Sequence, residues 1–162
     1  MTFQDMGTLG QNEANWTRLY PFFVDRNQEA PDSKEIPPLT VEQARQALWE
    51  DPTVRPEGIV LATRGGEWLG LSVLMVDPRS PHNFFTGVRP DVRGLGLARG
   101  LKLEVIRRAR ASGCTQLLTH NHSESVSMLA VNQRLGYERH TGLWSMRRTF
   151  PEPAHDLPLS PD

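Results

Sequence analysis

The feature that most restricts the fold of this chain is a glycine-containing turn between a strand-like run and a helix-like run. The run before it, residues 83–88, is rich in aromatic and β-branched residues, which favours a strand. After the turn, apolar residues recur every three or four positions among basic ones, which predicts an amphipathic helix to about residue 111. The apolar positions are Leu97, Leu101, Val105 and Ala109.

Two glycines, Gly94 and Gly96, bring bare main chain to the start of this helix. The first N–H groups of a helix have no intrahelical partner, and together with the helix dipole they favour a bound anion. Arg93, Arg99 and Lys102 add positive charge at the same end. The turn therefore predicts a site for the phosphate or pyrophosphate of a cofactor.

Two common phosphate-binding patterns do not fit this turn. A P-loop requires Lys followed by Ser or Thr after its last glycine, and the segment has neither. The dinucleotide fingerprint requires a third glycine where Arg99 stands and an acid some ~20 residues later, where residues 116–120 include none. The order Arg93-x-x-Gly96-x-Ala98 instead resembles the acetyl-coenzyme A loop of GNAT-superfamily N-acetyltransferases.

The resemblance continues beyond the turn. Residues 113–121 are similar to the next strand of that family, and residues 128–137 to its following helix and Leu-Gly-aromatic exit. Residues 86–102 and 119–132 are most similar to single domains of tandem, mycothiol synthase-like members. The resemblance implies an α/β (α+β) fold, with a central mixed sheet flanked by helices and a parallel strand–helix–strand cofactor unit.

The activity implied by the resemblance is acetyl-coenzyme A-dependent transfer of acetyl to a primary amine of a small molecule, by direct attack in a ternary complex. The family architecture implies splayed strands whose free N–H groups hold the pantetheine and polarise the carbonyl. The implied coenzyme contacts are Gly87, Val88, Arg93, Gly94, Leu95, Gly96, Leu97, Ala98, Asn121 and Asn132. The alternative is a non-catalytic coenzyme A-binding or interaction module derived from one half of a tandem protein. Because tandem relatives pair two such domains, a homodimer is compatible with the resemblance.

The general base is open to several interpretations. Aligning the strand ends at Val88 with the family places His82 near its base, and alternation puts His82 on one face with Phe84 and Thr86. A neutral imidazole suits a base near pH 7, although a surface histidine without a role is the alternative. A water relay needs no such residue, and three carboxyl groups are rivals: Glu13, Glu35 and Asp77.

The general acid is where the chain departs from the family pattern. Many members have a tyrosine at the position of Asn132, four residues before the Gly-aromatic pair. An asparagine cannot donate a proton as an acid, but it can hydrogen-bond the thiolate or the pantetheine. We therefore expect Asn132 in both the catalytic and the cofactor-binding set.

A metal site is not expected. His120 and His122 alternate onto one face of a predicted strand, which is typical of paired ligands. A catalytic zinc site needs a third ligand and an open position, and Glu124 is the one candidate nearby.

Length and composition set the outer limits. A chain of 162 residues with a net charge of −1 predicts one domain and no general affinity for nucleic acid. The single cysteine, Cys114, excludes an intrachain disulfide, and we expect it in the core. Neither a signal peptide nor an apolar run of the ~20 residues that span a bilayer is present, so we expect a cytoplasmic protein without a membrane partner. Residues 1–150 should form the domain and residues 151–162 a disordered proline-rich tail.

Local patterns predict the remaining elements. We expect, in chain order, a strand at 2–6, one kinked helix or two short ones at 11–25, a loop at 27–38, a helix capped by Thr40 and Gln43, a hairpin at 58–76, a strand at 115–121, a helix from Ser123 to about Leu135, and a last hairpin of 137–140 and 143–148.

Overall fold

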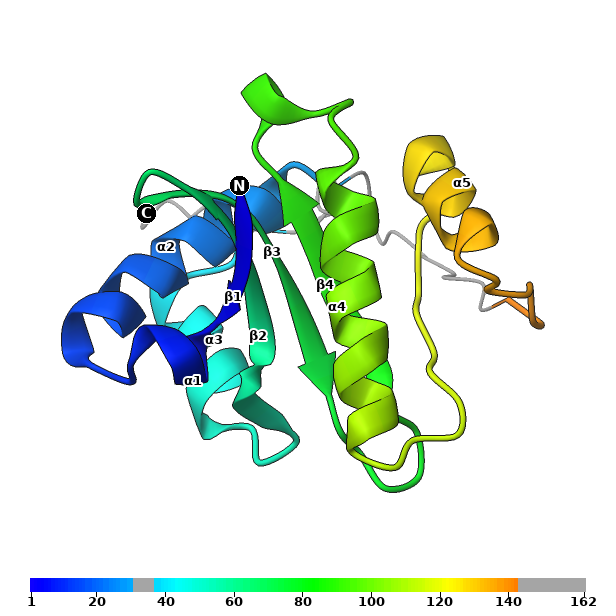
Figure 1. Ribbon diagram of the computed structural model, residues 1–162, viewed down its shortest axis with the longest axis horizontal. Helices are drawn as coiled ribbons and strands as arrows, with labels where there is room; N and C mark the ends of the chain where they lie inside the picture. Colours follow the sequence, from blue (N-terminus) through cyan, green and yellow to red (C-terminus); the bar gives the residue numbers. More distant parts are fainter. Residues whose placement is uncertain (31–36, 143–162) are drawn as a thin grey trace, which may run out of the picture.

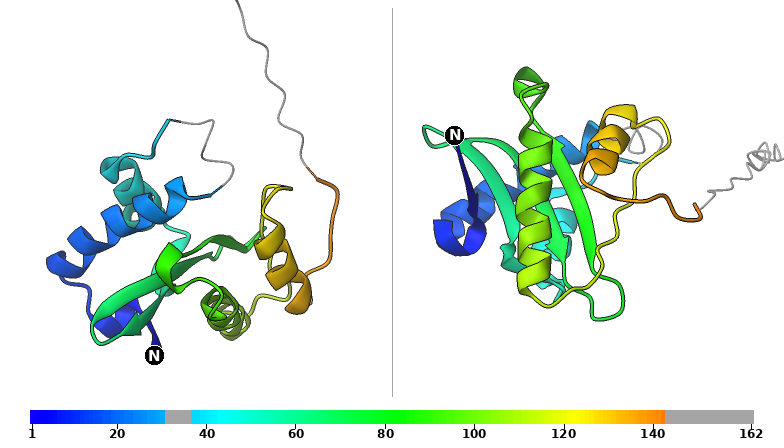
Figure 2. Two further views of the ribbon diagram at one scale, coloured as in Figure 1. Left: turned by 90° about the horizontal axis from the view of Figure 1, so that it is seen from above. Right: turned by 45° about the vertical axis from the view of Figure 1, so that its right-hand side comes forward.

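Four antiparallel strands form the centre of the computed structural model, which describes residues 1–30 and 37–142 (Figure 1). In sheet order they are β1 (Thr2–Asp5), β2 (Val54–Arg64), β3 (Glu67–Met75) and β4 (His82–Val88). The helical segments are α1 (Met6–Leu9), α2 (Glu13–Gln28), α3 (Val41–Arg45), η2 (Gln46–Glu50), η3 (Pro90–Val92), α4 (Leu97–Ala111) and α5 (Val126–Arg134). Figure 2 shows α2 and α3 on one face of the sheet and α4 on the other, with α5 beside α4 beyond the β4 edge.

The hairpin of β2 and β3 is the framework of this sheet. Its two-residue turn, Gly65–Gly66, has φ angles of 56° and 82°, which only glycine adopts readily. Because side chains alternate along a strand, β2 presents Ile59 and Leu61 to one helical layer and Val60 and Ala62 to the other. All four are fully buried. The hairpin prediction is confirmed.

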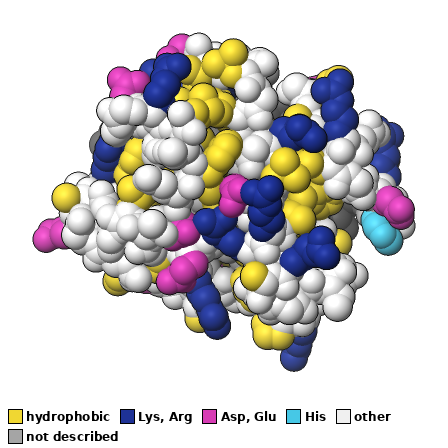
Figure 3. All heavy atoms as spheres, viewed as in Figure 1, with side chains coloured by type: hydrophobic (Ala, Val, Ile, Leu, Met, Phe, Trp, Pro, Cys, Tyr) yellow, Lys and Arg dark blue, Asp and Glu magenta, His cyan; other side chains and the backbone are white. Residues whose placement is uncertain are grey.

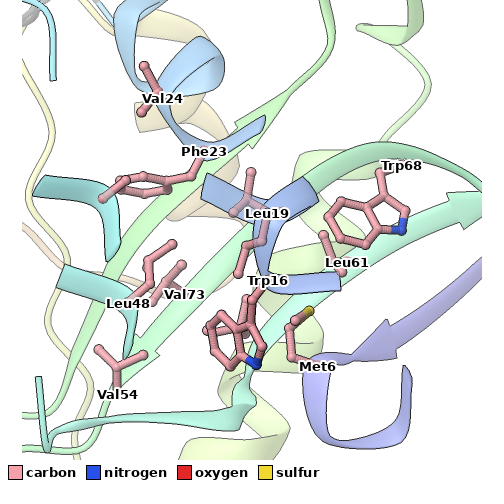
Figure 4. Close-up of a cluster of buried hydrophobic side chains, with 13 residues drawn as sticks. Met6, Trp16, Leu19, Phe23, Val24, Leu48, Val54, Leu61, Trp68 and Val73 are labelled. Carbon is pink, nitrogen blue, oxygen red and sulfur yellow. The ribbon is translucent and has the colours of Figure 1, made fainter. Parts of the chain in front are cut away.

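Each face of the sheet has its own core. On the α2 face, Trp16 and Leu19 of the helix belong to one buried cluster with Leu61 and Val73 of the strands (Figure 4). On the α4 face, the predicted stripe of four apolar residues is at most 2% exposed. Burying a side chain of this size contributes about 1.5–3 kcal/mol, so these two layers hold α2 and α4 in place.

The first half of the chain follows the local patterns closely. A first strand is present, and α2 is a single helix that continues through Pro21 and three residues beyond the predicted end. Thr40 accepts a hydrogen bond from the Gln43 N–H, and the Gln43 side chain bonds the Thr40 N–H in return, which confirms the capping box. After α3 the chain continues as a π-helical segment, Gln46–Glu50, which ends before Pro52.

The strand expected at 115–121 is wrong as a full strand. One parallel bridge, between His82 and Leu118, is formed within the described chain. The Asn83 N–H donates to Leu118 O at 2.8 Å, and beyond it the Thr119 hydroxyl, rather than a main-chain N–H, donates to Asn83 O. The direction is parallel, as predicted, but the described sheet is antiparallel and mixed only through this bridge.

Two further predictions near the C-terminal end need correction. The helix α5 begins at Val126 rather than after Ser123, because the main chain at 122–125 forms a turn in which the Ser125 N–H donates to His122 O. Residues 137–140 form no strand in the part of the chain that the structure describes. Glu35, the second strand at 143–148, the boundary at 150 and the tail at 151–162 lie outside the described residues.

Within residues 1–30 and 37–142, no helix is both long enough and apolar enough to cross a bilayer.

Candidate functional site

The turn before α4 presents a run of free main-chain N–H groups. Gly94 and Gly96 adopt left-handed φ angles of 79° and 78°, and a Cβ built on either would meet nothing within 4 Å. Among the described residues, the N–H groups of residues 94–98 donate to no protein acceptor, whereas the Arg93 N–H donates to Pro90 O. Leu95, between the two glycines, is 63% exposed. The predicted anion site is therefore an open loop of unpaired donors.

Buried residues on both sides hold this loop in position. Pro90 begins the short η3 turn, and Val92 inserts into the core on the α4 face. Leu97, the first residue of α4, is buried in the same cluster. With both ends fixed by packing, the main chain between them is held open toward solvent. Figure 3 shows several basic side chains, in dark blue, as separate groups on the side of the molecule where α4 lies.

Arg93 has protein partners in this conformation. Its guanidinium forms an ion pair with Glu29 at the C-terminal end of α2, and its Nε donates to Val88 O at 3.2 Å. Glu29 also pairs with Arg26 at 3.0 Å. The Arg93 side chain is 53% exposed, so it can leave Glu29 for an anion on the loop without uncovering the core.

The two residues at the end of β4 are more enclosed than the loop. A Cβ on Gly87 would lie 2.8 Å from Arg26 Cβ and from the Phe85 ring, so this position allows α2 to approach β4 closely. The Val88 side chain packs in the core on the α4 face, while its carbonyl accepts the Arg93 bond. Any ligand contact with these two residues has to use main-chain atoms.

One edge of β4 is open over most of its length. The pairing with the 115–121 segment stops at Asn83, and β4 is the last strand of the described sheet. Beyond Asn83, the β4 main chain has no strand beside it on this edge within the described residues. The open edge runs from the His82 end up to the glycine loop.

His82 lies at the end of β4 that is still paired with the 115–121 segment. Its Nδ1 is hydrogen-bonded to Ser80 O, and a carbonyl can only accept, so Nδ1 carries the proton and Nε2 is left free in the neutral ring. The ring stacks on His120 with centroids 5.2 Å apart. A bulge breaks the predicted alternation after His82, because the register shifts between the pairs Val73–Phe85 and Leu74–Asn83.

Asn121 and Asn132 lie together, although they come from a loop and from α5. Asn132 is 6% exposed, and its Nδ2 donates to Asn121 Oδ1 at 2.6 Å. Asn132 Oδ1 is buried and has no hydrogen-bond partner among the described residues. A buried acceptor without a donor is costly, so this oxygen is a candidate acceptor for a donor from beyond the described residues.

The rival acid–base groups are less well placed. Glu13 is exposed at the start of α2, and Asp77 accepts from the Arg79 N–H in a turn after β3. His122 lies 4.0 Å from Glu124, while His120 stacks on His82 instead. Within the described ranges, no three His, Cys, Asp or Glu side chains converge as metal ligands do.

Lys102, expected to add positive charge at the start of α4, is buried instead. Lys102 is 1% exposed, and its Nζ donates to Asn83 Oδ1 at 2.6 Å. Burial lowers the pKa of the ammonium to about 8. The signal for this position was its spacing, because Ala98, Lys102, Val105 and Ala109 recur at intervals of four and three.

Comparison with known families gives a match over most of the chain. The model of the Acetyltransferase (GNAT) family matches residues 15–137. The chain is also 27% identical over 137 residues to a mycothiol acetyltransferase of Paenarthrobacter aurescens, covering 80% of this chain and 40% of the relative. It spans about two fifths of the length of the curated relatives that it matches.

Solved structures share the fold. A ribosomal-protein-alanine N-acetyltransferase from Brucella melitensis superposes with a TM-score of 0.66 at 18% identity, covering 85% of each chain. AAC(6')-Iy in complex with a bisubstrate analogue, CoA-S-monomethyl-acetylneamine, gives a TM-score of 0.65 at 18% identity, covering 92% of this chain and 98% of that one. At this level of identity the likeness concerns the fold alone.

Proposed function

Because the chain belongs to the acetyltransferase (GNAT) family, we propose that it binds acetyl-coenzyme A on the 94–98 loop and transfers the acetyl group to a primary amine of a small molecule. The observation that carries the proposal is the run of unpaired N–H groups at the start of α4, opened by two left-handed glycines. Such donors at a helix N-terminus suit a diphosphate. When bound, the coenzyme supplies the acetyl group as an activated thioester.

The open edge of β4 offers a path from the loop to the reacting end. An extended strand rises about 3.3 Å per residue, so Val88 and His82 are separated by about 20 Å. That length is comparable to an extended pantetheine arm. Main-chain groups along such an edge are fixed donors and acceptors, which can orient the arm and polarise a carbonyl without any side chain.

In this proposal His82 is the base that takes the proton of the attacking amine. The bond from Nδ1 to Ser80 O fixes the tautomer, so Nε2 carries the free lone pair. Stacking on His120 limits rotation of the ring. A positioned base of this kind contributes typically 10²–10⁴-fold to the rate.

Asn132 has a holding role rather than an acidic one. Its unpartnered Oδ1 can accept an N–H of the pantetheine, while Nδ2 is held by Asn121. The side chain has no proton to give to the departing thiolate. A thiol ionises near pH 8.5, so it can leave without a general acid.

The experiment is a calorimetric titration with coenzyme A, using Gly96→Ala and Gly65→Ala as a matched pair. Both glycines have left-handed φ angles and open space around a new Cβ, so each substitution costs about 1–2 kcal/mol of backbone free energy. We expect only Gly96→Ala to weaken coenzyme binding. No binding of coenzyme A to the wild-type chain at millimolar concentration would end the proposal.

A second function is favoured by two observations. The family's usual tyrosine position is occupied by Asn132, and the chain spans two fifths of its relatives, which fits a non-catalytic coenzyme-binding half. Release of free thiol from acetyl-coenzyme A, measured with a panel of small amines, separates the two. Stimulation by any amine supports the transferase, and binding without stimulation by any of them supports the module.

A further inference from the structure

The ammonium of Lys102 is buried and has no charged partner among the described residues. It lies between α4, β4 and the 115–121 segment, with Nζ 2.6 Å from Asn83 Oδ1, 3.4 Å from Thr119 Oγ1 and 5.4 Å from the centre of the Tyr137 ring. Burial alone accounts for its lowered pKa, and no carboxylate contributes to the shift. An apolar side chain would fill this core position at lower cost, so the lysine is not explained by stability.

The contact with Asn83 fixes the orientation of a side chain that organises β4. Asn83 Nδ2 donates to Val73 O at 3.2 Å and to Phe85 O at 3.1 Å. Both acceptors are carbonyls, so the amide cannot be reversed, and Oδ1 must face Lys102. Asn83 thereby ties the two strands across the bulge that leaves Phe84 outside the β3–β4 register.

The same cluster lies where β4 and the 115–121 segment separate. The last main-chain bond between them is from the Asn83 N–H to Leu118 O, at 2.8 Å. The next contact is made by the Thr119 hydroxyl, which donates to Asn83 O at 3.2 Å and lies within reach of Lys102 Nζ. The side chains of Lys102, Asn83 and Thr119 therefore take the place of main-chain hydrogen bonds at the point where the open edge of β4 begins.

We propose that Lys102 is a positioning residue: acting through Asn83 and Thr119, it sets the β4 bulge and the separation point of the two segments, and so the main-chain groups available to the pantetheine arm. This rests on the proposed function, because the arm belongs to the proposed coenzyme. Lys102 itself contacts neither the diphosphate loop nor the reacting atoms in this scheme. Lys102 acts at the Asn83 end of the open β4 edge, which is remote from the glycine loop.

The test compares Lys102→Met, which keeps an unbranched side chain one heavy atom shorter and without the charge, with Arg110→Met, at an exposed basic position of the same helix. We expect Lys102→Met to fold, with coenzyme A binding weakened at least tenfold. Competition by ADP, which carries the diphosphate without the pantetheine arm, should be unchanged. Hydrogen exchange at the Asn83 and Leu118 amides should accelerate at least tenfold without any ligand. Arg110→Met should match the wild type in all three.

Several outcomes would overturn the proposal. One is a folded Lys102→Met that binds coenzyme A with wild-type affinity and shows wild-type exchange at both amides. Another is a Lys102→Met that loses affinity for coenzyme A and for ADP to the same extent. If Lys102→Met does not fold, Thr119→Val decides, since it removes only the hydroxyl: weaker coenzyme binding supports the proposal and unchanged binding refutes it. Failure of the wild type to bind coenzyme A would remove the proposed function, and the exchange comparison would still decide whether Lys102 sets the separation point.

Discussion

Asn132 of α5 donates a hydrogen bond from Nδ2 to Asn121 Oδ1 at 2.6 Å, and its own Oδ1 is left buried without a donor among the described residues. The pair joins the segment that follows α4 to α5, the last described helix. We propose that this buried oxygen accepts a hydrogen bond from an amide N–H of the coenzyme.

Replacing Asn132 with Ala should weaken coenzyme A binding about fivefold. The reason is that one hydrogen bond contributes about 1 kcal/mol net. Calorimetry on the variant and on Gln133→Ala, an exposed neighbour in the same helix, measures the difference. Equal affinity in the two variants would show that the Asn132 amide does not contact the coenzyme.

Replacing His82 with Gln should lower kcat about a hundredfold or more at neutral pH, since it removes the proposed base. The dissociation constant for coenzyme A should stay the same, because the imidazole is assigned to the amine proton alone. His122→Gln, at an exposed position, is the control. An unchanged kcat and pH–rate profile would exclude His82 and favour a water relay.

Replacing Glu29 with Gln should tighten coenzyme A binding up to about fivefold. In the free protein Glu29 holds the Arg93 guanidinium, so a diphosphate has to displace a surface ion pair that is worth up to about 1 kcal/mol. Glu42→Gln, which breaks a comparable pair with Arg45 on α3, should leave binding unchanged. Weaker binding in Glu29→Gln would mean that the carboxylate instead orients Arg93 for the ligand.

Burial of Lys102 predicts a specific pH dependence of stability. Its pKa is about 8 in the folded chain, below the ordinary value of 10.5, so the unfolded chain binds the extra proton between these pH values. The free energy of unfolding of the wild type should therefore rise with pH relative to Lys102→Met, by on the order of 2 kcal/mol between pH 8 and 10. Burial raises the pKa of Tyr137 to about 12, which acts in the opposite direction only above pH 10. Urea titrations at intervals across pH 7–10 measure this, and parallel curves for the two proteins would contradict it.

The elements that could be predicted are those whose information is local. The pair Gly65–Gly66 predicts a hairpin, and Thr40 with Gln43 predicts the start of a helix. Gly94 and Gly96 predict an open loop before α4. The stripe of apolar residues in α4 was equally readable from its spacing. In these cases the short-range chemistry and the final fold agree.

The rest depended on contacts between distant segments. Residues 115–121 pair with β4 through one bridge, and at the next position the Thr119 hydroxyl, from a distant part of the chain, occupies the Asn83 carbonyl. The burial of Lys102 requires the amide of Asn83 opposite it, and the pairing of Arg93 requires the end of α2. None of these can be read from one segment alone.

The most direct test of diphosphate binding on the loop follows the main-chain amide signals of residues 94–98 by NMR during titration. Coenzyme A should shift these signals strongly, and pantetheine, which lacks the diphosphate, should leave them in place while shifting those of β4. If saturating coenzyme A moves none of the 94–98 amides, or if pantetheine moves them equally, the loop does not bind the diphosphate.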